Sequence, residues 1–427
     1  MRRKARLHDL IGVRTASLAA AVLLGSCLAA TQAQAIPAFS REYKTECTTC
    51  HTIFPQLNEF GQAYEKNGFV WPGGVPMAKK VRVTQTEEER KSAEFIKLSG
   101  IPASIPVSFL TRVSYVYNDK AEDNFDQKRF NAEILTGGAF AGDKIGFWFH
   151  EGLGSNTTTS TSSLTGPSNL YFVARHPLGA PVHVKAGKFG PDLSLWRTGL
   201  SGRLMSTGYT AGGFMPTSAQ NGLEVSSFLG PRVQAIVGMN DRNSAPAGQP
   251  VHSVNDFYGR VSAKFGGADY LGKEPDIDLD KDSIWDYLSV SGSLFGYSGS
   301  TSTGDGVDHD LNRYGLEAEA AYKKTLLMLG ASTGENNADA DDPLKSTAFS
   351  AEVDYVFNSM FAVALRYDTL DVDGLERRSV ITPAVIYAPL QNFRLSLSVA
   401  DDTNPTSAAT GKAVKTTTAT LTASMSF

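Results

Sequence analysis

The chain has 427 residues, of which 41% are hydrophobic and 10% aromatic. This composition excludes a disordered chain, and the length suits two or three domains or one large barrel with an appendage. Because 40 Lys and Arg stand against 44 Asp and Glu, no excess of positive charge indicates a nucleic-acid partner. After residue 35, no apolar stretch approaches the roughly 20 residues that a membrane helix requires. If this protein lies in a membrane, it must cross it as strands.

The N-terminus has the pattern of an export signal. An apolar core over 16–30 is followed by Ala33-Gln34-Ala35, an A-x-A cleavage site. We therefore predict a signal peptide over 1–35 and a mature chain that starts at Ile36. Two alternatives stay open: an uncleaved membrane anchor, and lipoprotein-type cleavage that leaves Cys27 acylated. The core is preceded by a basic head made of Arg2, Arg3, Lys4, Arg6 and Arg14.

The mature chain keeps two cysteines, both in the run Cys47-Thr48-Thr49-Cys50-His51. A C-x-x-C-H run in an exported protein predicts covalent attachment of one c-type haem. Cys47 and Cys50 can each add to one haem vinyl group, and His51 can then present its imidazole to the iron as the proximal ligand. A structural disulfide would leave the histidine unexplained. A thioredoxin-like redox pair would need a βαβ context, which the sequence lacks.

The residues around the motif predict a small helical haem module with its linker over 36–103. We expect one short helix to carry the motif and a second helix to begin at Pro55 and run over 56–67. Asn67-Gly68 should end that helix, because both residues tolerate left-handed backbone geometry.

The sixth iron ligand is less constrained by the sequence than the other haem contacts. Met77 follows a Pro- and Gly-rich stretch over 71–76, and Met/His ligation raises the reduction potential, which suits electron transfer. Met77 is therefore the favoured ligand. The alternatives are an ordinary loop methionine, an open sixth position, or a ligand from the remainder of the chain such as His150, His183 or Met215.

From residue 104 onward, the sequence alternates between apolar and polar residues with a period of two. Short turns, for example Gly142-Asp143 and Asn358-Ser359, alternate with long polar stretches at 155–168, 191–221, 241–255, 299–310, 336–346 and 401–412. This pattern predicts an outer-membrane β-barrel of about 16 antiparallel strands over 104–427, with the short turns on the periplasmic side. The last strand ends on Phe427, which is similar to the terminal signal read by the outer-membrane insertion machinery. A soluble all-β domain is the alternative.

Charged residues at the inward positions of these strands should line the lumen. We expect them to form a wet interior, or to guide ions or a plug. They are Arg112, Arg260, Glu317, Glu319, Glu352, Asp354 and Arg366.

The N-terminal region resembles the fused monohaem cytochrome–porin family of outer-membrane cytochromes, known from iron-oxidising bacteria. The matching residues are Pro37-Ala38-Phe39 with Arg41, the motif at 47–51, Phe54-Pro55 with Leu57, Phe60-Gly61 and Asn67-Gly68-Phe69. The resemblance implies a haem at the periplasmic side or inside the barrel, with Cys47, Cys50 and His51 as its attachments. It also implies electron flow from an extracellular donor, with Fe(II) favoured, to a periplasmic c-type cytochrome.

Other functions remain open at this stage. Ser40 and the stretch 42–46 are more charged than in the iron-oxidising members, so the donor and the direction of flow stay undecided. A solute porin whose haem module acts as a plug or sensor is one alternative, and a soluble periplasmic haem enzyme is another. No Ser/His/Asp set, carboxylate pair or phosphate loop indicates hydrolytic or transfer chemistry. From the barrel pattern, we expect this protein to lie in a Gram-negative-type outer membrane, in contact with its lipid.

Overall fold

The computed structural model describes most of the chain after the expected signal peptide. The described residues are 38–43, 47–72, 107–120, 127–155, 168–194, 204–205, 219–241, 254–273, 288–302, 308–337, 344–358, 360–404 and 414–426. The predictions on the signal peptide over 1–35, on Cys27, Met77 and Met215, and on the terminal Phe427 lie outside these residues. Within them, no helix is both long and apolar enough to cross a membrane.

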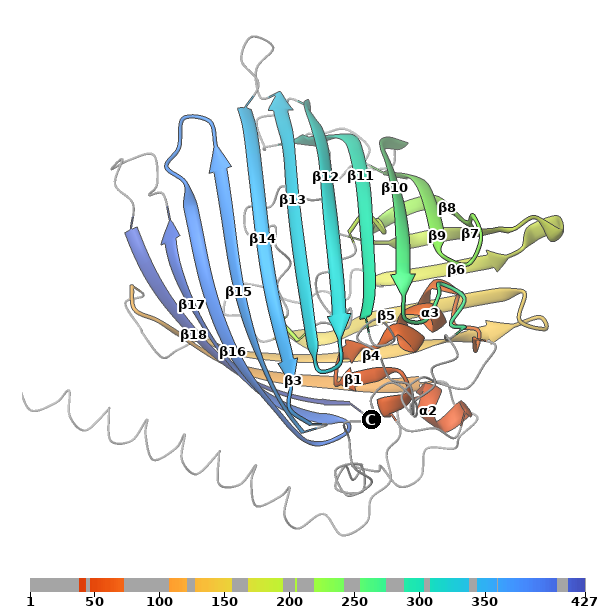
Figure 1. Ribbon diagram of the computed structural model, residues 1–427, viewed down its shortest axis with the longest axis horizontal. Helices are drawn as coiled ribbons and strands as arrows, with labels where there is room; N and C mark the ends of the chain where they lie inside the picture. The colour runs from red at the N-terminus through yellow and green to blue at the C-terminus, as the bar shows by residue number, and fades with distance from the viewer. Residues whose placement is uncertain are drawn as a thin grey trace, which may run out of the picture.

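Sixteen strands, β3 to β18, form one closed antiparallel barrel, which confirms the predicted strand number (Figure 1). The barrel closes where β18 pairs with β3, from Thr418 opposite Asn118 to Ser426 opposite Leu110. The strands are β3 (Val107–Asn118), β4 (Gln127–Phe140), β5 (Ile145–Ser155), β6 (Asn169–Arg175), β7 (Val182–Phe189), β8 (Gln220–Phe228), β9 (Val233–Asp241), β10 (Val254–Gly266), β11 (Leu288–Ser302), β12 (Asp308–Tyr322), β13 (Thr325–Asn337), β14 (Leu344–Val356), β15 (Phe361–Val372), β16 (Arg378–Leu390), β17 (Phe393–Asn404) and β18 (Val414–Ser426).

Alternation along the strands gives the barrel an apolar outside and a polar inside. In β10, Phe257 and Phe265 are 56% and 65% exposed, whereas the intervening Arg260 and Ser262 are buried on the inner side. A closed ladder leaves no strand edge, so every spanning backbone group finds a partner without water. Barrels with this surface are the form in which proteins cross the bacterial outer membrane. The closed barrel also excludes an open soluble sandwich.

The predicted short turns are found at one end of the barrel. The predicted turn at Gly142 and Asp143 joins β4 to β5. Similar turns at the same end are that of Lys323 and Lys324 between β12 and β13, and one between β6 and β7 that contains the 3-10 helix η3 (Pro177–Gly179). The first barrel strand, β3, starts at this end, and the last strand, β18, finishes there. Since short turns face the periplasm in outer-membrane barrels, we expect this end to be the periplasmic mouth.

One predicted outer loop folds inward instead. The stretch 191–221 reads as a long polar loop, but its described residues 191–194 and 204–205 lie inside the barrel, and its last two residues already belong to β8. We call residues 191–194 and 204–205 the inward segment. Asp192 accepts hydrogen bonds from Arg260 of β10 at 3.0 and 3.3 Å, and Leu193 packs in a buried cluster with Ile236 and Tyr258. Burying Leu193 and pairing the Asp192 carboxylate favour the inward position over a fully solvated one.

The N-terminal module lies in the mouth at the short-turn end of the barrel, and its helices are drawn in red to dark orange in Figure 1. It consists of α2 (Ala38–Tyr43), the 3-10 helix η1 (Cys47–Thr49), the two-stranded β1 (His51–Ile53) and β2 (Gln56–Leu57), and α3 (Glu59–Lys66). These elements are short, and most of them meet the barrel wall through side chains.

Two helix predictions in the module were wrong. The motif is not carried by a helix, because α2 ends at Tyr43, η1 covers only three residues, and His51 begins a strand. The second helix starts at Glu59 rather than at Pro55. Asn58 offers the stronger helix start, since its side chain accepts a hydrogen bond from the Gly61 amide at 2.9 Å. The predicted helix end is confirmed, with Gly68 at a φ of 67°.

Candidate functional site

The cysteines of the motif lie close together, and neither forms a disulfide. Cys47 is 7% exposed, and the amide of Cys50 donates to the carbonyl of Cys47 at 3.1 Å. Burial, together with the neighbouring Cys47, raises the pKa of the Cys50 thiol to about 12. A thioredoxin-like pair needs the opposite, a cysteine with a lowered pKa that attacks as a thiolate. The burial of Cys50 therefore disfavours a thioredoxin-like redox pair.

His51 is held by the main chain that follows it. Its Nδ1 lies 2.9 Å from the carbonyl oxygen of Pro55, and burial lowers the pKa of the imidazole, which is then neutral at pH 7. A carbonyl acceptor places the ring proton on Nδ1 and leaves Nε2 to bind a metal. Two cysteines outside any disulfide, beside a histidine oriented in this way, form a donor set that fits the haem attachment expected from the sequence.

Helix α3 packs directly on the motif. The Asn58 amide donates to the carbonyl of Cys50 at 2.9 Å, and its side-chain Nδ2 donates to the carbonyl of Thr49 at 3.0 Å. A Cβ atom at Gly61 would overlap the carbonyl oxygen of Cys50, so only glycine allows this approach. The helix and the motif therefore form one packed unit.

Aromatic rings fill the interior of the module and continue into the barrel wall. Ring centroids of Tyr43 and Trp71 are 4.5 Å apart, and those of Phe39 and Tyr64 are 5.0 Å apart. Phe69 stacks on Trp148 of β5 at 5.2 Å, which joins the module to the wall. Such ring pairs stabilise beyond the area that they bury.

Polar contacts fix the module on further sides. Glu59 forms an ion pair with Lys264 of β10 at 2.8 Å, accepts from the Ala268 amide at 2.8 Å, and accepts from the Ser289 hydroxyl. The Gln56 side chain donates to Asp354 of β14 at 2.7 Å. The Cys47 amide donates to the side chain of Gln391, in the turn before β17, at 3.0 Å. These contacts reach strands on different sides of the mouth.

Burial raises the pKa of Glu59, but the charge of Lys264 and the hydrogen bonds to Glu59 outweigh it, so that its pKa lies below the ordinary value of 4.5. Glu59 is therefore charged at neutral pH. The ion pair with Lys264 crosses the boundary between module and wall, where neither partner is fully solvated.

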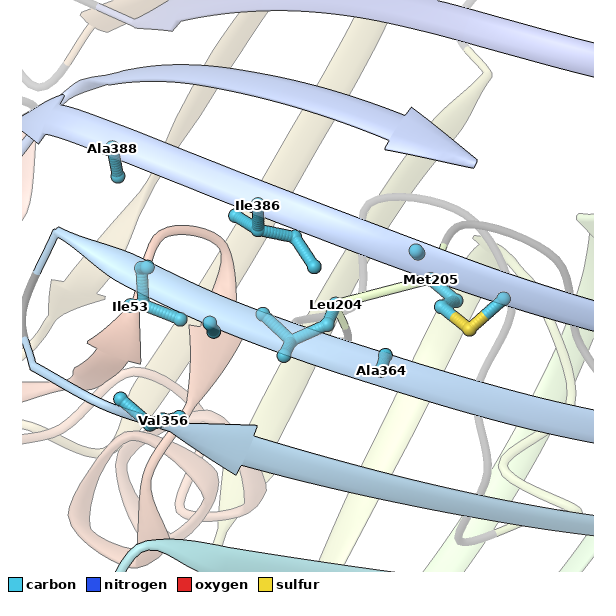
Figure 2. Packing of buried hydrophobic residues seen from close by; sticks show 9 residues of the cluster. Ile53, Leu204, Met205, Val356, Ala364, Ile386 and Ala388 are labelled. Carbon is cyan, nitrogen blue, oxygen red and sulfur yellow. The ribbon is translucent and has the colours of Figure 1, made fainter. Parts of the chain in front are cut away.

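An apolar contact completes the attachment. Ile53, two residues after His51, is 2% exposed and lies between the inward segment and the wall. Figure 2 shows its side chain among Leu204 and Met205 of that segment and Ile386 of β16. The module, the inward segment and the wall thus share one buried cluster next to the motif.

The two described candidates for a sixth ligand make their side-chain contacts away from the motif. His150 of β5 bonds through Nε2 to Glu133 at 3.1 Å, and His183 of β7 packs between the rings of His176 and Phe228. No described contact joins either histidine to the motif. The expected lumen charges do face inward, and Arg366 and Glu352 form a buried ion pair at 2.5 Å.

Comparison with known proteins supports the barrel fold. No family model matches the chain, and no curated protein matches it. Among solved structures, the anion-selective porin from Comamonas acidovorans is similar, with a TM-score of 0.50 and 13% identity over 75% of this chain and 98% of that one. The outer membrane channel DcaP of Acinetobacter baumannii has a TM-score of 0.50 and 14% identity over 75% and 96% of the two chains. At these identities the likeness shows a shared porin-like fold.

Proposed function

We propose that this protein is an outer-membrane electron conduit in which one covalent c-type haem is held inside the periplasmic mouth of the barrel. One observation carries the proposal: a C-x-x-C-H motif with an oriented histidine sits inside the mouth of a closed barrel. The resemblance of the N-terminal region to the cytochrome–porin family supports it. The barrel makes an opening in the lipid, and the module fills the periplasmic end of that opening.

Each residue of the motif has a role in this proposal. Cys47 and Cys50 provide the thioether sulfurs, and His51 provides Nε2 as the proximal ligand while Pro55 holds its Nδ1 proton. Met77 is our proposed sixth ligand. When bound, the haem supplies reversible one-electron exchange, and the chain needs no bond-making residue. The proposed donor is extracellular Fe(II), and the proposed acceptor is a periplasmic c-type cytochrome.

The test uses oxidised protein in sealed outer-membrane vesicles that face outward. Impermeant chelated Fe(II) is added outside, and the haem absorbance is followed. We expect the bands of reduced haem to appear rapidly in the wild type and to be missing in Cys47→Ser/Cys50→Ser. A haem that is reduced by dithionite but not by Fe(II) would remove iron as the donor. A wild type without haem absorbance would overturn the whole proposal.

A solute pore is the second candidate, and the porin-like fold favours it. Planar-bilayer recordings of the full chain separate the two functions. If the module fills the mouth, we expect conductance far below that of an open barrel of this size. A large conductance with the haem in place would favour a solute porin that carries a haem plug.

A further inference from the structure

Arg394 lies on the barrel wall, three residues after Gln391, whose side chain contacts the motif. It is the second residue of β17 and follows the turn in which Gln391 accepts the hydrogen bond from the Cys47 amide. Its Nη2 donates to the carbonyl of Leu204, and Leu204 packs in the same buried cluster as Ile53. Contacts from both ends of the segment 47–53 therefore converge on the wall around Arg394.

The charge of Arg394 is incompletely compensated. The residue is 9% exposed, its Nε has no hydrogen-bond partner, and among the described residues no carboxylate lies within ion-pair distance. The carboxylate of Asp354, which accepts a hydrogen bond from Gln56, acts on Arg394 only through the longer-range attraction of opposite charges. A buried guanidinium with an unused donor is unfavourable unless an anion binds it.

A second arginine lies in the same row of the wall. Ser424 of β18 is the register partner of Arg394 on one side and of Arg112 of β3 on the other. Arg112 bonds to Glu133 through Nη2, while its Nε is also buried without a partner. Two guanidinium groups that repel one another, each with an open donor, suit a ligand that carries two carboxylates.

We propose that Arg394, with Arg112 beside it, binds the propionate carboxylates of the haem attached at Cys47 and Cys50. This inference rests on the proposed function, because it requires the haem. Guanidinium groups match carboxylates in shape and charge, and such charge-assisted hydrogen bonds are stronger than neutral ones. The wall would then take part in binding the cofactor, rather than only surrounding the module that carries it.

The expected consequence is a change in the reduction potential. Cationic partners of the propionates favour the reduced haem, which carries one positive charge less than the oxidised haem. Removing the cation should therefore lower the potential. For Arg394→Gln we expect a decrease of about 60 mV, which corresponds to a tenfold shift in a one-electron equilibrium. Arg112→Gln should give a smaller decrease, because Glu133 already compensates part of its charge.

The experiment is a spectroelectrochemical titration of the purified, haem-loaded full chain. Arg394→Lys is the rescue variant, since it keeps the charge, and it should restore most of the potential. Arg378→Gln is the matched control, because Arg378 pairs with Asp402 at 2.6 Å near the other end of β16. Haem content is measured in parallel by the pyridine haemochrome spectrum, and it should equal that of the wild type in every variant.

The outcomes separate this inference from the proposed function. A wild type without haem overturns the proposed function and removes the basis of the inference. Haem-loaded Arg394→Gln with the potential of the wild type overturns the inference alone. If Arg394→Gln does not fold, a lowered potential in Arg112→Gln supports the inference and an unchanged one overturns it. Succinate, added to the haem-loaded full chain as a free dicarboxylate, is the second probe, and we expect it not to bind the wild type. If succinate binds the wild type but not Arg394→Gln, and the potential of that variant is unchanged, the ligand is a free dicarboxylate and the proposal is overturned.

Discussion

The barrel wall and the module in its mouth are stabilised in different ways. Each wall strand pairs with two neighbours through backbone hydrogen bonds, and β11 and β12 alone are in register over 15 residue pairs. The module has elements of two to eight residues, and its main polar contacts reach wall residues such as Lys264 and Gln391. The wall thus depends on local alternation, whereas the module depends on particular side chains that lie far away in the sequence.

The largest expected effect follows from Gly61→Ala. The new Cβ would overlap the Cys50 carbonyl, so α3 must move away from the motif, at a cost of about 3 kcal/mol or more. We expect protease to cut the module and haem content to fall, while the heat-modifiable gel mobility of the barrel stays unchanged. Gly259→Ala is the control, since its Cβ would find its nearest neighbour at 3.4 Å. Equal protease resistance in both variants would show that the close approach does not matter.

Glu59→Gln should have the next largest effect. Lys264 has only 6% of its side chain exposed, and leaving it unpaired costs about 3 kcal/mol. Because the fold lowers the pKa of Glu59, the ionised carboxylate contributes fully to the stability of the module above pH 4.5. This contribution is lost as the pH falls below that value and the carboxylate is protonated. Protease accessibility of the wild-type module should therefore rise in acid, and in Glu59→Gln it should be high at neutral pH already. Glu376→Gln, at an exposed position between β15 and β16, is the control and should behave as the wild type.

Asn58→Ala tests the helix start that the sequence did not predict. It removes the N-cap and the bond to Thr49, and should destabilise the module by about 1 kcal/mol. Asn58→Asp keeps an oxygen for the cap but loses the donor to Thr49. We expect its hydrogen exchange in α3 to be intermediate between that of the wild type and of Asn58→Ala.

Lys415→Met should have the smallest effect. The ion pair with Asp401 is 2.7 Å long, but the two side chains are 66% and 42% exposed, so its loss should cost less than about 1 kcal/mol. We expect no measurable change in the unfolding temperature of the barrel. A clear decrease in the unfolding temperature would mean that the wall, like the module, depends on single side-chain pairs.

The same contrast explains what could be predicted from the sequence. Strand number and short turns followed from a period-two pattern, because each strand of a membrane barrel meets similar surroundings. The motif at 47–51 was recognisable because it is contiguous. The helix start at Asn58 was missed because Pro55 gave a competing signal, and Pro55 instead places its carbonyl beside His51.

The other failures concern contacts between distant residues. Nothing local to Glu59 indicates Lys264, and nothing local to Leu193 indicates that its loop would pack inside the barrel against Ile236 and Tyr258. Such contacts depend on which wall positions come together after the barrel closes. The incompletely compensated charge of Arg394 was missed for the same reason. In the sequence, Arg394 alternates with apolar neighbours as any lumen-facing residue does.

The hydrogen bond between the Cys47 amide and Gln391 has a consequence for the order of assembly. It joins residues 344 positions apart, and its acceptor lies in the turn between β16 and β17. This contact cannot form until nearly the whole chain has been exported. The part of the chain that enters the periplasm first is thus among the last to reach its final place, and any enzyme that modifies Cys47 and Cys50 has access to them during that interval.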